Sequence, residues 1–273
     1  MAALFEHERD ALAWYEKQEP VCTPSFVTSV PWDDVRRHAI KAEFVPVLRY
    51  MRDVESFTTI YDAELRKTPT GRDPVIRAFL DRWSTEEPVH GALLHRFLGE
   101  AGHDDARGDW AATASRNIPF GYRLRSPLKA LLANAFHRHF AAVHMTWGAI
   151  NELSTLNGYL RLWKLAKHPV LERILRAIAR EEARHAFFYW SVARIQLLRS
   201  KFRQALTRYI VRQFWTPVGQ GTKPAQETNR TIAALFRGPE GVAFFHQNVN
   251  RRIEDLPGLS GLDVMTTRIA AAR

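Results

Sequence analysis

The sequence predicts an all-α protein built on a four-helix bundle, with additional helices at its C-terminal end. Apolar residues follow a helical period through most of the chain, and Gly and Pro fall largely between the periodic segments. A Glu-x-x-His pattern also occurs twice, as Glu87 with His90 and Glu182 with His185, each about thirty residues after a lone glutamate. A Glu and a His three residues apart share one face of a helix, so each lone glutamate must come from a neighbouring helix.

The first pair of bundle helices is predicted over residues 31–66 and 74–99, joined by a short turn. The midpoint between Glu55 and Glu87 falls inside this turn, so an antiparallel arrangement brings the two carboxylates to the same height. Asp73 can cap the second helix because a proline directly follows it at the first helical position.

The second pair of bundle helices is predicted over residues 127–166 and 169–200. The midpoint between Glu152 and Glu182 lies beside His168, where one helix ends and the next begins. At ~1.5 Å per residue, each of these side chains would lie roughly 23 Å from its turn, well inside the bundle.

The rest of the chain is expected to connect or cover this bundle within one domain. That domain spans residues 1–273, with its core at about 31–200 and a helical extension over 201–273. The predicted connecting and covering segments are a long link (101–126), a basic helix (200–214), a loop (217–224) and two shorter helices (about 225–236 and 239–254).

Four carboxylates and two imidazoles that converge inside a bundle form the ligand set of a carboxylate-bridged site for two metal ions. Carboxylate-rich sites with one histidine per metal suit iron or manganese better than structural zinc. The predicted metal ligands are Glu55, Glu87, His90, Glu152, Glu182 and His185.

Two other glutamates compete for these positions. Glu64 lies nine residues after Glu55 and points to the opposite helical face, so only one of them can face inward. Glu55 keeps the thirty-residue symmetry and Glu64 does not. In the second pattern, the three-residue spacing to His185 selects Glu182 over Glu181.

A third Glu-x-x-His, Glu100 with His103, is expected to be a chance match because a glycine between them marks a helix end. The alternative for each of the other two patterns is an exposed, salt-bridging glutamate beside an ordinary histidine. His137, His139 and His144 are expected to be polar or packing residues rather than further ligands.

Four motifs occur in order along the predicted bundle helices. Residues 83–94 read W-S-T-E-E-P-V-H-G-A-L-L, and residues 179–185 read A-R-E-E-A-R-H. Glu55 is followed six residues later by Tyr61, and Glu152 begins an E-x-x-T pattern that ends at Thr155. These motifs, with L-P-G-L-S at 256–260, resemble the soluble, ferritin-like acyl-[acyl-carrier-protein] desaturases, whose helices read W-T-A-E-E-x-x-H-G-x-L-L and A-x-D-E-x-R-H.

Three positions depart from the family pattern. Pro88 lies inside the first Glu-x-x-His and lacks the amide that would bond the carbonyl of Ser84, so a kink or local bulge is expected there. Glu181 replaces the family's Asp and remains an acceptor for a ligating histidine. The family's electron-transfer tryptophan matches only Trp14, and loosely.

The resemblance implies a ferritin-like di-iron enzyme that uses dioxygen to introduce a double bond into an acyl chain carried by an acyl carrier protein. By resemblance, the six predicted ligands hold two iron ions that cycle between Fe2+ and Fe3+, and Thr155 helps to manage protons. A ferredoxin-type protein supplies electrons, and the family's habit indicates a homodimer.

The charge of the chain agrees with an acidic partner. The formal net charge is +10, and Lys and Arg concentrate near residues 199–212 and 251–252. Electrostatic steering would therefore bring an acidic carrier protein to the chain in a salt-sensitive way. Nucleic acid is not expected, because no helix-turn-helix, zinc-finger or RNP motif occurs.

The compartment is expected to be the cytoplasm. Cys22 is the single cysteine and cannot form an internal disulfide, and the N-terminal residues lack the apolar core of a secretory signal. No run of eighteen apolar residues predicts a membrane span.

Two alternative functions remain open from the sequence. One is a di-iron oxygenase or oxidase that acts on another small molecule, and the other is a ferritin-like iron-binding protein without an organic substrate. Apolar residues near the proposed site either line a substrate pocket or form ordinary core; they are Phe57, Trp83, Trp147, Leu156 and Phe187.

Overall fold

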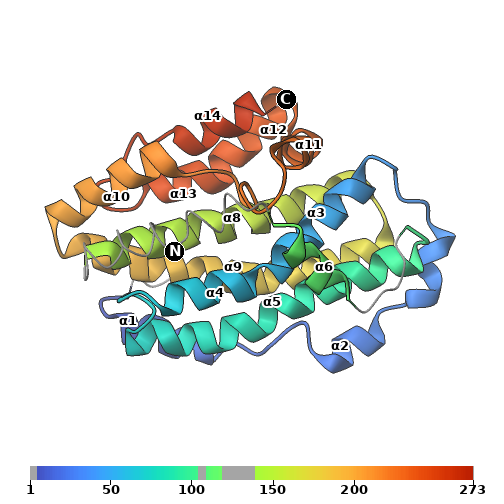
Figure 1. Ribbon diagram of the computed structural model, residues 1–273, viewed down its shortest axis with the longest axis horizontal. Helices are drawn as coiled ribbons and strands as arrows, with labels where there is room; N and C mark the ends of the chain where they lie inside the picture. The colour runs from blue at the N-terminus through green and yellow to red at the C-terminus, as the bar shows by residue number, and fades with distance from the viewer. Residues whose placement is uncertain (1–4, 104–108, 119–138, 273) are drawn as a thin grey trace.

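The computed structural model describes residues 5–103, 109–118 and 139–272, and over these residues the protein is all-α. The bundle consists of α3 continued by α4, with α5, α8 and α9, and the C-terminal helices cover one side of it (Figure 1). The helices are α1 (Glu8–Glu16), α2 (Pro24–Ser29), η1 (Trp32–Arg37), α3 (Phe44–Ser56), α4 (Thr58–Arg66), α5 (Pro74–Glu100), α6 (Trp110–Arg116), α8 (Phe140–Ala166), α9 (Pro169–Leu198), α10 (Lys201–Phe214), α11 (Ala225–Phe236), α12 (Gly238–Phe245), η3 (His246–Asn250), α13 (Arg251–Glu254) and α14 (Val264–Ala271).

The two short turns that set the height of the bundle helices lie where the sequence predicted them. Asp73 Oδ1 accepts hydrogen bonds from the amides of Val75 and Ile76, at 2.9 and 3.2 Å, and so caps α5. At the second turn, Lys167 ends α8 in the left-handed conformation, and His168 Nδ1 accepts a hydrogen bond from the Leu171 amide at 3.3 Å. Both caps satisfy amides that have no partner within the helix.

The prediction of a continuous first helix over 31–66 was wrong. A 3₁₀ turn covers residues 32–37, and α3 begins only at Phe44. A second break at Phe57, two residues after Glu55, separates α3 from α4. The Ser56 and Thr58 hydroxyls donate to backbone carbonyls three residues earlier, both at 2.6 Å, and this local bonding competes with a regular helix.

The other described helices follow the prediction closely. The helices at 74–99, 169–200, 200–214 and 225–236 are present, and the third bundle helix is helical from Phe140; residues 127–138, with His137, lie outside the described part of the chain. The stretch 239–254 is helical but contains the π-helical turn η3.

Pro88 does not interrupt α5, and the bulge expected beside it is replaced by regular α-helix. Instead, the irregularity next to the proposed site is the break at Phe57 on the neighbouring helix. No helix in the described residues is long and apolar enough to cross a membrane.

Candidate metal centre

All six predicted ligand residues converge in the centre of the bundle. Glu55 comes from α3, Glu152 from α8, and each Glu-x-x-His pair from α5 or α9. Two groups of four residues form there, and in each group one ligand atom from every residue lies within 4.8 Å of the others. The groups are Glu55, Glu87, His90 and Glu182, and Glu87, Glu152, Glu182 and His185.

Glu87 and Glu182 belong to both groups, so each could bridge two cations. The other residues divide evenly, with one terminal carboxylate and one imidazole on each side. This is the arrangement of a two-metal carboxylate site in a helical bundle. Glu64, Glu100 and His103, which competed in the sequence, belong to neither group.

Both histidines turn Nδ1 toward the carboxylates. His185 Nδ1 lies 2.9 Å from Glu87 Oε1, and His90 Nδ1 lies 3.1 Å from Glu182 Oε1. These four atoms and Glu182 Oε2 are buried, yet none of them makes a hydrogen bond. Because buried polar atoms are normally paired, unpaired oxygen and nitrogen atoms that point at one another fit a site for metal ions.

The opposite nitrogen of each histidine is held by the glutamate that directly precedes the other Glu-x-x-His pattern. His90 Nε2 on α5 lies 2.8 Å from Glu181 Oε2 on α9, and His185 Nε2 on α9 lies 2.7 Å from Glu86 Oε2 on α5. A carboxylate on Nε2 keeps the proton there and leaves the Nδ1 lone pair for a metal.

Each of these supporting carboxylates is itself fixed by further donors. Arg82 Nε and the Tyr15 hydroxyl donate to Glu86, at 2.7 and 2.8 Å. Burial alone would raise the pKa of Glu86, but the hydrogen bond and charge of His185, with the hydrogen bonds from Arg82 and Tyr15, lower it to about 2. Glu86 therefore carries a full negative charge at neutral pH.

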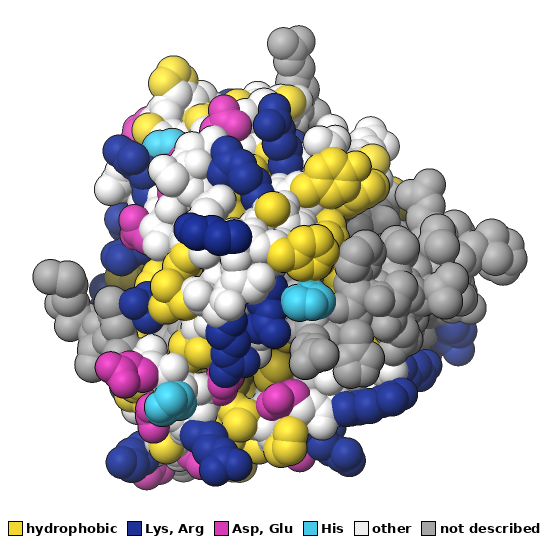
Figure 2. All heavy atoms as spheres, turned by 90° about the vertical axis from the view of Figure 1, so that its left-hand side faces the viewer, with side chains coloured by type: hydrophobic (Ala, Val, Ile, Leu, Met, Phe, Trp, Pro, Cys, Tyr) yellow, Lys and Arg dark blue, Asp and Glu magenta, His cyan; other side chains and the backbone are white. Residues whose placement is uncertain are grey.

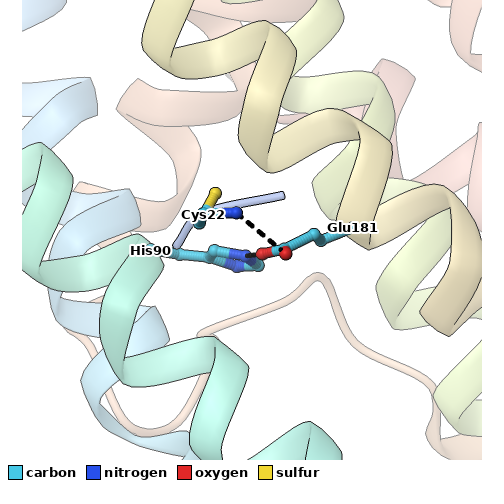
Figure 3. Close-up of side chains that lie close together, drawn as sticks. All are labelled: Cys22, His90 and Glu181. Atoms are coloured by element: carbon cyan, nitrogen blue, oxygen red, sulfur yellow. Dashed lines mark hydrogen bonds and ion pairs between the residues drawn. The ribbon is translucent and has the colours of Figure 1, made fainter. Parts of the chain in front are cut away.

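Glu181 is held in the same way by the N-terminal segment of the chain (Figure 3). Its Oε1 accepts the Cys22 amide at 3.0 Å and lies 3.1 Å from Arg184 Nη2, and the Cys22 thiol lies beside the same imidazole, that of His90. Burial raises the pKa of Cys22. The thiol is therefore protonated at neutral pH. Burial raises the pKa of Glu181, but the hydrogen bond and charge of His90 outweigh burial and hold this pKa well below its usual range.

The central carboxylates repel one another strongly. Burial and the charge of Glu87 raise the pKa of Glu152 to about 7, and they raise the pKa values of Glu55 and Glu182 well above the usual range. Burial would lower the pKa of His185, but Glu86 and Glu87 raise it to about 9. Bound cations would relieve this crowding of negative charge.

Glu55 has an additional partner that the sequence patterns did not reveal. The Tyr159 hydroxyl, fully buried on α8, donates a hydrogen bond to Glu55 Oε1. Tyr159 follows Glu152 by seven residues, two helical turns along α8, and this spacing was the only available signal. Tyr15 was also missed, because the sequence comparison drew attention to its neighbour Trp14 as the family's electron-transfer tryptophan. Trp14 packs against Phe187, with ring centroids 4.5 Å apart.

An apolar cavity of about 70 Å³ borders the centre. Glu55 and Thr155 line it, together with residues of the C-terminal helices and Trp215. Thr155 therefore lies where the cavity meets one of the two groups. The surface of this cavity is almost entirely apolar.

The five apolar residues considered as pocket walls do not line this cavity. Phe57 and Trp83 are buried in hydrophobic clusters, as the ordinary-core alternative predicted. The lining comes from α3, α8 and the C-terminal extension. The sequence predicted that this extension covers the bundle but not which of its residues face the cavity. His144 and His139 are likewise packing residues, the first bonded to Thr70 and the second against Phe202.

The loop at 215–224 closes one side of the cavity and is fastened to α3. The Tyr50 hydroxyl donates to the Val218 carbonyl at 2.6 Å. Lys223 Nζ lies 2.8 Å from Asp53 Oδ2 in a partly buried ion pair. These contacts fix the loop over the bundle next to Glu55.

One family model, described as fatty acid desaturase, matches residues 54–207 of this chain. No curated protein matches the chain, and no solved structure does so. The matched segment is more than half of the 273 residues and contains all six residues of the two groups. The chain therefore belongs to the fatty acid desaturase family.

Proposed function

We propose that this protein is a di-iron, dioxygen-dependent desaturase that introduces a double bond into an acyl chain carried by an acyl carrier protein. The observation that carries the proposal is the pair of buried four-residue groups that share Glu87 and Glu182. Membership of the fatty acid desaturase family supports the reaction class.

In this proposal each residue of the centre has a defined part. Glu55 and His90 would hold one iron, Glu152 and His185 would hold the other, and Glu87 and Glu182 would be shared between them. Oxygen-rich ligand sets with one imidazole per ion suit iron. When bound, the iron pair supplies the reduction of dioxygen and the oxidising power needed to remove hydrogen from an unactivated carbon chain.

The residues around the irons orient the ligands and position the substrate. Glu86 and Glu181 hold the imidazole protons, and Tyr159 holds Glu55 by its hydroxyl proton. The apolar cavity takes a short segment of the acyl chain beside Glu55 and excludes water from it. Thr155, which lines the cavity near Glu55, donates and accepts protons at its hydroxyl.

The proposed partners are an acidic acyl carrier protein and a ferredoxin-type electron donor in the cytoplasm, and the proposed assembly is a homodimer. The net charge of +10 supports an acidic partner. Within the basic stretch 199–212, Lys201 is exposed, but Arg203 is buried and bonded to Gln196. Arg203 therefore supports the fold rather than a docking surface.

Iron analysis tests the centre. The parent should bind two irons per chain, and Glu152→Ala and His185→Ala should each lose iron, with Glu100→Ala as the control that retains it. Retention of both irons in either site variant would remove the ligand assignment.

Product analysis tests the reaction. With a saturated acyl carrier protein substrate, reduced ferredoxin and dioxygen, the acyl product should lose two hydrogens. A gain of one oxygen would instead identify an oxygenase, and oxygen consumption without any acyl product would identify an iron-oxidising protein.

A further inference from the structure

Helix α10 carries its large apolar residues on the outside of the molecule. The most exposed large hydrophobic side chains of the described chain are Leu198, Phe202, Tyr209 and Phe214, with exposed fractions of 56%, 52%, 59% and 61%. They lie at the end of α9 and along α10, and we call them the α10 patch. Figure 2 shows hydrophobic side chains among Lys and Arg on the end of the molecule where α10 begins.

The inner face of α10 carries polar side chains, whereas large apolar ones are exposed. The helix buries Arg203, Thr207 and Val211 against the bundle while Phe202 and Tyr209 remain in water. Folding alone favours the reverse, because burying a large apolar side chain stabilises a protein by about 1.5–3 kcal/mol. Exposed aromatic residues gathered on one helix therefore indicate a surface that something else covers.

The charge around the α10 patch defines what covers it. The sequence contains no Asp or Glu between Glu182 and Glu227, and α10 itself carries Lys201, Arg208 and Arg212. Lys201 and Arg212 are exposed beside the aromatic side chains. The occupant is therefore negatively charged as well as apolar.

We propose that the α10 patch docks on an anionic lipid surface. Phe, Tyr and Leu side chains flanked by Lys and Arg are the composition of helices that lie in the plane of a membrane, with rings among the acyl chains and cations at the headgroups. A lipid surface offers a continuous negative charge and requires no matching pocket. Helix α10 lies at the outer edge of the molecule, where such a surface can reach it (Figure 1).

The patch also lies next to the cavity. Phe214, the last residue of α10, directly precedes Trp215, which lines the apolar cavity beside Glu55. A lipid surface on α10 would therefore border the place proposed for the acyl chain. The docking does not depend on the proposed reaction, because no residue of the patch belongs to the metal centre.

Vesicle cosedimentation tests the proposal. The parent should bind vesicles of phosphatidylcholine with about 30% phosphatidylglycerol, and bind pure phosphatidylcholine far more weakly. Raising the salt from about 0.1 M should release the protein, because screening weakens attraction to the headgroups. Failure of the parent to bind the anionic vesicles at about 0.1 M salt would overturn the proposal.

Two double variants separate the apolar and charged contributions. Phe202→Ser with Tyr209→Ser should weaken vesicle binding about tenfold or more, and Lys201→Gln with Arg212→Gln should weaken it about fivefold for each charge. The matched control is Arg37→Gln with Lys41→Gln, which removes the same charge near the start of α9, at the far end of that helix from α10, and should leave binding unchanged. Unchanged binding of the serine variant would also overturn the proposal.

Two further measurements distinguish other occupants. All variants should keep the parent's thermal midpoint and iron content, since the substituted side chains are exposed. If the serine variant converts a dimer to a monomer in sedimentation, the patch is a contact between copies. If the serine variant no longer associates with an acidic acyl carrier protein and the parent does not bind vesicles, the occupant is a protein. Either result would overturn the lipid assignment.

Discussion

The two nitrogens of each imidazole in the centre face different carboxylates. His90 and His185 place Nε2 against Glu181 and Glu86, and this contact turns Nδ1 toward the shared carboxylates. The supporting acids stay ionised because donors surround them. The orientation of the proposed ligands therefore depends on residues that would not touch a metal themselves.

Replacing the supporting acids tests that dependence. Glu86→Gln and Glu181→Gln keep the size of the side chain but remove the charge that holds the imidazole proton. Metal affinity measured by titration calorimetry should fall about 10- to 100-fold in each variant. Glu100→Gln, from the third Glu-x-x-His, should leave affinity unchanged. Parent-like affinity in both site variants would show that the acids do not orient the ligands.

His144 should make the protein sensitive to mild acid. Burial lowers the pKa of His144 from 6.5 to about 4. The folded state therefore resists protonation, so the stability linked to this neutral ring is full above about pH 6.5 and is lost as the pH falls toward about 4. The loss should approach about 3 kcal/mol.

A thermal scan between pH 7 and pH 4 checks this expectation. His144→Gln can keep the hydrogen bond to Thr70 but cannot gain a proton. Its melting temperature should fall less than that of the parent as the pH decreases. Parallel curves for the two proteins would contradict the assignment.

At the scale of the helix, two glycines of α8 have opposite surroundings. A Cβ at Gly158 would lie 3.4 Å from Met51 Cε and 3.7 Å from Leu235 Cδ1, which is ordinary contact. A Cβ at Gly148 would lie 2.3 Å from the ring of Tyr189. Gly148 is therefore required by close packing, whereas Gly158 leaves space beside the cavity that it lines.

Alanine substitutions should reveal this difference in chemical denaturation. Gly158→Ala should raise the free energy of unfolding by up to ~1 kcal/mol, because glycine weakens a helix interior. Gly148→Ala should lower it by about 1–3 kcal/mol, because the ring of Tyr189 must move. A loss of stability in both variants would mean that the space at Gly158 is needed for packing.

The sequence predicted helices best where their ends carry local signals. Asp73 and His168 each precede a proline, and both helix starts are where these residues indicated. The break at Phe57 was missed because it arises from hydroxyl groups bonding back to nearby carbonyls, which does not disturb the apolar period. The lining of the cavity was missed because the packing of the C-terminal extension is a long-range property.

The candidate centre was predictable because its residues repeat at a fixed helical spacing. The supporting role of Glu86 was not recognised, since it depends on which residue of the opposite helix lies level with it. The contact between Tyr159 and Glu55 joins residues 104 positions apart. No local sequence pattern predicts either pairing.

For the whole molecule, the centre concentrates charge where the fold is otherwise apolar. Glu87, Glu182 and His185 are almost completely buried. Without cations, the repulsion among the carboxylates must be relieved by taking up protons, at a cost to stability. Bound metal should therefore contribute strongly to the stability of the entire bundle.

Metal removal should lower the melting temperature by roughly 10 °C at saturating metal. Scanning fluorimetry before and after treatment with a chelator measures the change, and added Fe2+ under anaerobic conditions should restore it. The Glu152→Ala variant should show a smaller response. Identical melting with and without chelator, in a parent shown to contain iron, would contradict the expected coupling.

The exchange of supporting acids between α5 and α9 has a consequence for how the centre fills. An ion that orders one histidine also orders the supporting glutamate bonded to it. That glutamate directly precedes Glu87 or Glu182, each of which belongs to both groups. Occupancy should therefore rise cooperatively, so that half-filled chains stay a minor species throughout a metal titration.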